Sequence, residues 1–522
     1  MEIHGVLPLA SVLAPAALMA AMVARAALAP LGTVSVPKLW RMFRVVSYAA
    51  LALTGMSLMA GVNASPWPTL INPMTFSLVL AVLVQLLGTV IATFSARYLE
   101  GEANQQRYIG ALAAVLSSVH VLLLADHWLL LIAAWALVGV ALRHLLCFYP
   151  DRPFALLAAH KKNIADRLAD LMLLGAAALA WLEVGSGSLS VLWVHIAQHG
   201  MSLPLHCSAI LLVLAVTLRT ALLPVHGWLI QVMEAPTPVS ALLHAGVVNL
   251  GGFVLIRFAP MLEQAIAARI LLLVLGLVTA VLAGMVMLTR ISIKVRLAWS
   301  TVAQMGFMLL ECALGLYTLA ALHLVGHSLY KAHAFLSASD VVRQTRLRAL
   351  HGAAAASAAS VMLAPVLTTA VIFLVLKMAA LTAWPWWWSL VLGLAWAPVL
   401  WLPAARVDWS VRSAQHMFGL SIVVGLTGVA MLAHTLPLGL KDAPDHRLGL
   451  IALMGMAALY IFQALLQHRP QLLSRWRRWS YAGFYLDEAY TRLALFIWPA
   501  DWTPETASSL TPNVVATPLA DA

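Results

Sequence analysis

The sequence predicts an all-α, polytopic membrane protein with about 13–15 transmembrane helices. Its 522 residues are 62% hydrophobic and only 10% charged, with a mean hydropathy of +0.91. No soluble domain of this size has such a composition. The three cysteines are far apart and form no CxxC pair, so we expect neither a disulfide framework nor a metal cluster.

The apolar runs define the expected spans, because about 20 apolar residues are needed for each crossing. On that basis the spans lie near residues 5–29, 43–62, 72–95, 109–125, 128–149, 164–184, 207–230 (broken), 237–258, 270–288, 297–316, 318–340, 361–383, 386–404, 416–436 and 448–467. The first run carries Arg25 at its far end, so we expect a first helix rather than a cleaved leader.

The basic residues support this order of spans. If the N-terminus lies outside, Lys and Arg gather in the inside loops, whereas the outside loops 63–71 and 185–206 hold none. The exceptions are Arg269, Lys441 and Arg447. This is the positive-inside distribution of a membrane protein, so the net charge of +11 does not indicate nucleic-acid binding.

The chain is organised around residues 218–257, an apolar stretch that carries ionisable groups and is interrupted by prolines. The ionisable residues are Arg219, His226, Glu234, His244 and Arg257, and the prolines are Pro224, Pro236 and Pro238. Proline removes a backbone donor and breaks the helix. In a membrane, a broken helix is tolerated only inside protein or beside a water-filled cavity. Buried charges beside such a break predict an ion or proton path.

A second polar site lies on the expected span 318–340. His323, His327 and Lys331 are spaced i, i+4 and i+8, which places them on one helix face. Three titratable groups in register favour a proton relay over a set of satisfied polar contacts. A zinc site is the other alternative, but we rank it lower because the sequence has no HExxH motif and no nearby carboxylate on that face.

A third group of charges lies where the expected span 164–184 enters the membrane. Arg167 and Asp170 are spaced i, i+3 and could pair, with Lys161 one to two turns earlier. An interfacial salt bridge and a role at the mouth of a half-channel are both open. Lys377, in a later span, is better explained as a lysine that snorkels from a helix end.

The motifs Pro224–Leu229 (PVHGWL) and Met233–Ala245 (MEAPTPVSALLHA) resemble the signature of the antiporter-like membrane subunits. That family includes NuoL-type subunits of respiratory complex I, large Mrp subunits and DabB-type subunits of inorganic-carbon pumps. The resemblance implies an inverted-repeat architecture with broken helices. The expected divisions are N-terminal helices at 1–108, a first repeat at 109–258, a second repeat at 259–404, C-terminal helices with an amphipathic segment at 405–500, and a disordered tail at 501–522.

The resemblance extends to residues 293–308 and the His-His-Lys face, and it implies a central polar axis. It also favours the channel mouth over the salt bridge for the charges near Asp170. The expected proton path comprises Lys161, Arg167, Asp170, Arg219, Glu234, His244, Lys294, His323, His327 and Lys331.

Two positions depart from the family pattern. Arg219 stands where the family usually has a lysine, and Ala136 follows Trp135 where the family has a glutamate that pairs with that lysine. Arginine keeps its charge, so Arg219 is better described as a fixed positive charge than as a proton carrier. Glu234 and Glu311 are the membrane acids that could compensate for the missing glutamate.

The DabB-type branch is favoured because the sequence predicts neither the long lateral helix and final anchor of a NuoL-type subunit nor the added domains of a large Mrp subunit. Residues 483–490 (GFYLDEAY) also resemble the C-terminal end of DabB-type and NuoL-type chains. This branch implies a transporter subunit of the bacterial inner membrane that conducts H⁺ or Na⁺. It implies no cofactor in this chain and a DabA-like, zinc-containing partner related to carbonic anhydrase. The alternatives are a redox-driven or Na⁺/H⁺ antiporter subunit and, less favoured, a standalone metalloenzyme.

Overall fold

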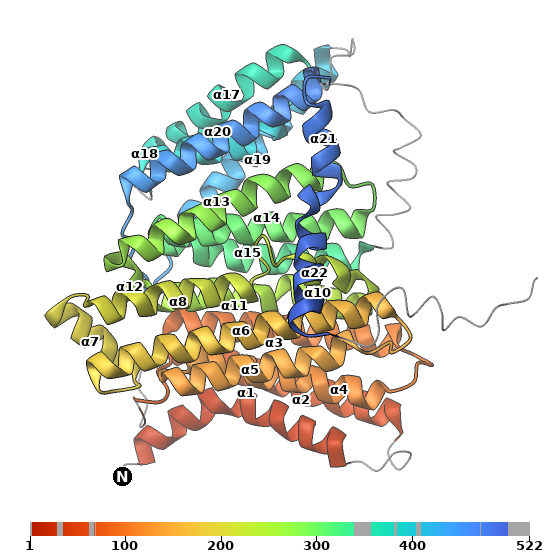
Figure 1. The fold of residues 1–522 in the computed structure, drawn as a ribbon, viewed down its shortest axis with the longest axis vertical. Helices are drawn as coiled ribbons and strands as arrows, with labels where there is room; N and C mark the ends of the chain where they lie inside the picture. The colour runs from red at the N-terminus through yellow and green to blue at the C-terminus, as the bar shows by residue number, and fades with distance from the viewer. Residues whose placement is uncertain are drawn as a thin grey trace, which may run out of the picture.

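The protein is an all-helical bundle, as the sequence predicts. The computed structural model describes residues 3–28, 35–61, 67, 69–338, 356–379, 384–402, 409–469 and 471–499. Isolated β-bridges pair Ile71 with Ala125 and His127 with Ser188. The long helices lie side by side with their axes roughly aligned (Figure 1).

The N-terminal helices are α1 (Ile3–Leu28), α2 (Val36–Met59), α3 (Thr75–Tyr98), α4 (Gln105–Leu124), α5 (Trp128–Leu146), α6 (Pro153–Val184), α7 (Leu189–His199) and α8 (Leu203–Arg219). After the central region follow α12 (Ala259–Gln264), α13 (Ile266–Leu288), α14 (Ile293–Ala313), α15 (Tyr317–Leu336), α17 (Ala358–Met378), α18 (Trp386–Trp396), α19 (Trp409–His434) and α20 (His446–His468). Within the described stretches, nine helices are long and apolar enough to cross a membrane, and three shorter ones are also apolar. The chain is therefore a multi-pass membrane protein.

The central region is broken twice. After α8 the chain continues through α9 (Gly227–Gln231), η1 (Val232–Glu234), α10 (Thr237–Ala245), η2 (Val247–Asn249) and α11 (Leu250–Arg257). The first break coincides with the prolines, as expected. The second, at η2, divides a span for which the sequence predicts a continuous helix. Residues 237–257 are the most buried of the nine spans, so protein rather than lipid surrounds the break at η2.

Several helices differ from their expected boundaries; α2 begins at Val36 and α19 at Trp409, rather than near residues 43 and 416. Helix α6 begins at Pro153 rather than near residue 164, which places Lys161 and Asp170 within one continuous helix. The outside loop 185–206 contains the short helix α7. The expected tail at 501–522 lies outside the described residues, and the proposed division into repeats stays a prediction.

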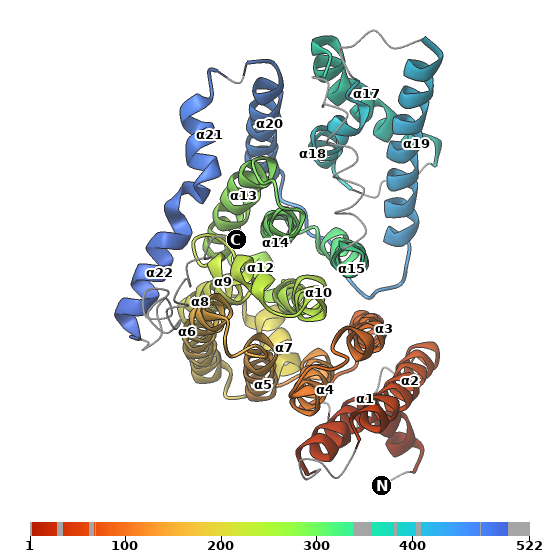
Figure 2. The same cartoon turned by 90° about the vertical axis from the view of Figure 1, so that its right-hand side faces the viewer.

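Figure 2 shows the bundle along its helices. Helices α1–α5 occupy one side, α17–α19 form a group at the far side, and α10 lies between them with α13–α15. The broken helix is thus placed in the middle of the molecule.

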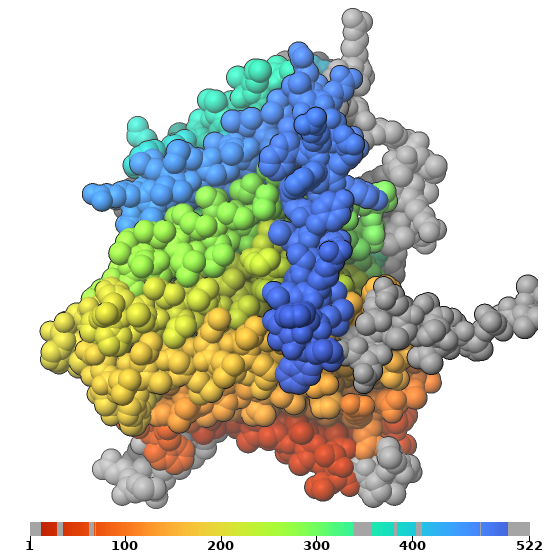
Figure 3. All heavy atoms as spheres, viewed as in Figure 1, coloured from red at the N-terminus to blue at the C-terminus, as the bar shows by residue number. Residues whose placement is uncertain are grey.

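A lateral segment crosses one end of this bundle. It consists of α21 (Ser474–Tyr481), η4 (Gly483–Tyr485) and α22 (Leu486–Ile497). Figure 1 and Figure 3 show it in dark blue, running nearly at right angles to the long helices from α20 to α6. The sequence predicts an amphipathic segment here. The structure adds that it reaches across the bundle from α20 to α6.

Candidate ion path

The first charged cluster lies where α8 ends. The buried side chain of Arg219 donates hydrogen bonds to the carboxylate of Asp170 on α6 and, over 2.8 Å, to the carbonyl oxygen of Trp135 on α5. Its guanidinium also lies 4.8 Å from the centre of the Trp135 ring. On the other side of the carboxylate, Arg167 Nη1 lies 3.1 Å from Asp170 Oδ2. Asp170 therefore forms ion pairs with two arginines, the buried Arg219 and the partly exposed Arg167.

This cluster shows how the chain accommodates the missing glutamate at position 136. The partner of Arg219 is Asp170, which comes from α6 instead of α5. Neither acid that the sequence suggested is the partner. The side chain of Glu234 is exposed, because this residue ends a short 3₁₀ turn, and only its backbone carbonyl is engaged, by Arg152. Glu311 pairs with His323 instead. The structure therefore does not bring Glu234 into the buried row of charges.

A second cluster lies one to two turns earlier on α6. Lys161 is fully buried and forms an ion pair with Asp487 of the lateral helix α22. Its ammonium also donates to Thr491 Oγ1 over 2.8 Å, and its carbonyl accepts from the Tyr490 hydroxyl over 2.7 Å. The lateral segment therefore holds α6 through three side chains.

The next residue, Lys162, pairs with Asp166 one turn along α6, and both side chains are buried. The ammonium of Lys162 lies 5.3 Å from the centre of the Trp228 ring. Sequence analysis missed both residues. The signal was a lysine and an aspartate spaced i, i+4 in an apolar span.

The helix break at Gly227 is needed for this packing. A Cβ atom at this position would lie 1.4 Å from Asp487 Oδ1 and 2.7 Å from Lys161 Nζ. Beside it, the ring of His226 lies 4.8 Å from that of Trp299 on α14. The break thus brings α6, α14 and α22 together around the start of α9.

A third cluster contains the predicted relay. Lys331 on α15 is buried and donates to Leu297 O over 2.9 Å and to Ser300 Oγ. His327 is buried on the same helix, and the buried ring of His244 on α10 stacks on Phe335 of α15, with the ring centres 4.5 Å apart. The structure therefore brings the broken helix and the predicted relay face together.

The relay face continues towards an acid. The rings of His327 and His323 are 6.1 Å apart, and His323 Nδ1 lies 2.9 Å from Glu311 Oε2 on α14. The sequence placed no carboxylate on this face, and the structure supplies one from the neighbouring helix. Among the described residues there is no group of three or more His, Cys, Asp or Glu side chains arranged to hold a metal ion.

The two buried imidazoles in this cluster are unusual. Across the part of the chain that the structure describes, neither ring nitrogen of His244 or His327 has a hydrogen-bond partner. The amide oxygen of Asn249, on η2, is in the same situation. Buried polar groups of this kind are normally satisfied by ordered water. The cluster is therefore suited to a short chain of water molecules.

Two lysines lie at the edge of the helical bundle, outside the buried clusters. Lys294, at the start of α14, is half-buried and donates to Thr237 Oγ1 over 3.2 Å, which places it at the N-terminal end of α10. Lys377 is exposed in the last turn of α17, in agreement with the snorkelling interpretation.

Arg257 belongs to a separate ion pair. Its Nη2 lies 3.0 Å from Asp126 Oδ1, and both side chains are buried. The other carboxylate oxygen of Asp126 accepts from the backbone N–H of Ser190 (3.1 Å) and from its hydroxyl (2.7 Å). This pair joins α11 to the α4–α5 connection and the start of α7, so we assign it a structural role.

The fold and these clusters define a class of protein. Residues 125–386 match the family described as NADH:quinone oxidoreductase/Mrp antiporter, TM. A fold neighbour, the structure of the Mrp complex from Dietzia sp. DQ12-45-1b, has a TM-score of 0.55 and 21% identity, and the match covers 95% of this chain and 58% of that one. The chain is therefore an antiporter-like membrane subunit.

Two more similar relatives narrow the assignment. The chain is 40% identical over 433 residues to the probable inorganic carbon transporter subunit DabB of Hydrogenovibrio crunogenus, covering 81% of this chain and 82% of that protein. It is 37% identical over 492 residues to the probable inorganic carbon transporter subunit DabB2 of Halothiobacillus neapolitanus, covering 86% and 84%. Within the antiporter-like family, the chain belongs to the DabB-type subunits. The resemblance inferred from the motifs is confirmed.

Proposed function

We propose that this chain is the cation-conducting subunit of an inorganic-carbon pump in the bacterial inner membrane, and that the cation is the proton. The observation that carries the proposal is the buried cluster of His244, His327 and Lys331, with its unpartnered imidazole nitrogens. Histidine and lysine both exchange protons with water, and ionisable groups in the membrane interior mark ion paths. The names of the relatives supply the link to inorganic carbon.

The proposed path runs through the second half of the family domain. Protons would pass between Lys331 and the two histidines and reach Glu311 through His323. Lys294 would serve at the opposite mouth, beside Thr237. All of these groups can gain or lose a proton.

The first charged cluster would act differently. Arg219 retains its charge and is held by Asp170, which also binds Arg167. We assign this cluster a fixed electrostatic role instead of a step in proton transfer.

The chemistry would take place in a partner. A DabA-like protein related to β-carbonic anhydrase, carrying zinc, would convert CO₂ and water to bicarbonate and a proton. Proton flow through this chain would drive a conformational change at the shared interface and make hydration one-way. The alternative is a proton-pumping or Na⁺/H⁺ antiporter subunit. It is supported by 30% identity over 269 residues to NADH-quinone oxidoreductase subunit L of Mycobacterium tuberculosis.

The test is CO₂-dependent growth and labelled bicarbonate uptake in cells that express this chain with its partner. Lys331→Ala and His327→Ala should abolish uptake while the complex still purifies intact. The matched control is Lys377→Ala, which removes a lysine that is exposed at a helix end. Normal uptake by both relay variants would refute the path. Uptake that ignores protonophores, with no zinc in the purified complex, would refute the function as a whole.

A further inference from the structure

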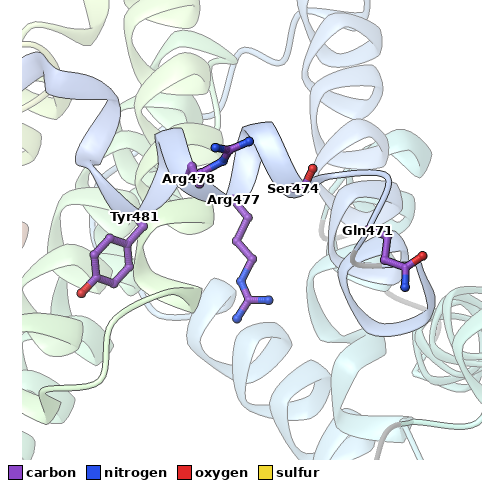
Figure 4. Close-up of a pocket in the computed structure, with 5 residues that line it drawn as sticks. All are labelled: Gln471, Ser474, Arg477, Arg478 and Tyr481. Atoms are coloured by element: carbon purple, nitrogen blue, oxygen red, sulfur yellow. The ribbon is translucent and has the colours of Figure 1, made fainter.

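A pocket lies beside the first helix of the lateral segment. It has a volume of about 580 Å³ and is lined by Gln471, Ser474, Arg477, Arg478 and Tyr481. Ser474, Arg478 and Tyr481 are spaced i, i+4 and i+7 and so share one face of α21. Figure 4 shows the side chains of Arg477 and Gln471 extending to one side of the helix and those of Arg478 and Ser474 lying on the other. The lining contains two guanidinium groups, three neutral polar groups and no carboxylate.

The charge around this pocket is unbalanced. Residues 469–486 contain four arginines and no Asp or Glu. None of these arginines forms an ion pair within the described stretches. The next acid along the chain, Asp487, is committed to Lys161. The pocket therefore has a surplus of positive charge that no ion pair among the described residues neutralises.

The surroundings of the pocket are those of a helix at the membrane surface. Helix α21 follows the spanning helix α20 after a short turn and lies across the end of the bundle. Large apolar side chains around the pocket are exposed, among them Leu472, Trp476, Trp479 and Tyr485. Tryptophan and tyrosine beside arginine are typical of the interface between headgroups and acyl chains. The pocket is thus expected at the depth of lipid phosphates.

We propose that this pocket binds the headgroup of an anionic glycerophospholipid. The planar fork of arginine matches two phosphate oxygens at once, and the hydroxyls of Ser474 and Tyr481 can add hydrogen bonds. A lining without carboxylates offers no ion pair to the cationic group of a zwitterionic lipid. The exposed tryptophans provide apolar surface for the acyl chains, which a soluble phosphate would leave uncovered.

The bound lipid would also stabilise the lateral segment. Tyr481 lies at the end of α21, and Arg290 stacks between its ring and that of Trp299, at 5.7 Å and 5.4 Å. Trp299 in turn contacts His226 at the helix break. A headgroup at Arg477 and Arg478 would therefore hold a segment that touches the broken helix.

The test uses the purified full chain, stripped of lipid in a neutral detergent. Binding of phosphatidylglycerol and of phosphatidylcholine with the same acyl chains is measured by native mass spectrometry and by the rise in melting temperature. We expect selective binding of phosphatidylglycerol. The variant Arg477→Gln/Arg478→Gln should bind it at least about tenfold more weakly, because it loses the charge-assisted hydrogen bonds of both pocket arginines to the phosphate.

The matched control is Arg475→Gln, which removes an exposed arginine of the same helix that does not line the pocket. It should bind like the unmodified chain. Arg477→Lys keeps the positive charge but removes the planar guanidinium group. This variant is measured if the double variant does not fold. Equal binding by the double variant, an equal loss in the control, or full competition by glycerol phosphate would each overturn the lipid site.

Discussion

The replacement Asp170→Asn tests whether the first charged cluster depends on its single carboxylate. The substitution keeps the size of the side chain and removes the charge that Arg219 and Arg167 share. Arg219 would remain buried as a cation, with the carbonyl and ring of Trp135 as its remaining partners. We therefore expect a clear loss of stability.

The structure sets the magnitude of this loss. Breaking a buried ion pair by neutralising one partner costs about 3–5 kcal/mol. The lower end applies here, because an asparagine oxygen can still accept from the guanidinium and Arg167 is partly exposed to solvent. Unfolding entropy is about 2.1 cal/mol/K per residue, or about 1.1 kcal/mol/K for 522 residues. A cost of about 3 kcal/mol then lowers the melting temperature by about 3 °C.

The assay is thermal melting of the purified chain in detergent, together with a second-site rescue. Ala136 follows Trp135, whose carbonyl already binds Arg219. In the Asp170→Asn background, Ala136→Glu would return a carboxylate from α5 and should recover at least half of the lost stability. Ala136→Gln supplies the same size without the charge and should not.

Two results would refute this reasoning. One is an Asp170→Asn chain that melts at the same temperature as the unmodified protein. The other is a rescue by Ala136→Gln as complete as that by Ala136→Glu, which would show that packing and not charge decides the stability of this cluster.

Three further substitutions test the other clusters. Asp487→Asn leaves the buried Lys161 without its ion-pair partner and should lower the melting temperature by about 3 °C. Glu488→Gln, at the exposed neighbouring residue, should leave the melting temperature unchanged. Equal shifts for the two variants would argue against the Lys161–Asp487 pair. Gly227→Ala places a methyl group where the Asp487 carboxylate lies. Size-exclusion chromatography of solubilised membranes should therefore show less folded chain. A normal yield would contradict the close contact between Gly227 and Asp487. Glu311→Gln should leave folding intact but reduce bicarbonate uptake at least tenfold, because His323 loses its charged partner; full uptake would exclude this acid from the path.

The sequence by itself determined the class of fold and the course of the chain. Hydropathy is a local property, so each apolar run indicates a span without knowledge of its neighbours. The breaks near Pro224 and Pro236 follow from the chemistry of proline. The common face of His323, His327 and Lys331 follows from helical spacing alone. The exception was the break at η2, where no proline marks the interruption.

Only the tertiary structure decided which charges pair between helices. Arg219 and Asp170 are 49 residues apart, and Lys161 and Asp487 are 326 apart. The sequence suggested Glu234 and Glu311 for Arg219, because they are acids in apolar surroundings. Whether a carboxylate reaches a guanidinium depends on which helices are neighbours and how each is rotated, and hydropathy carries neither kind of information. The pairs between helices are therefore a consequence of helix packing, which places the carboxylates of α6, α14 and α22 beside the basic side chains of α8, α15 and α6.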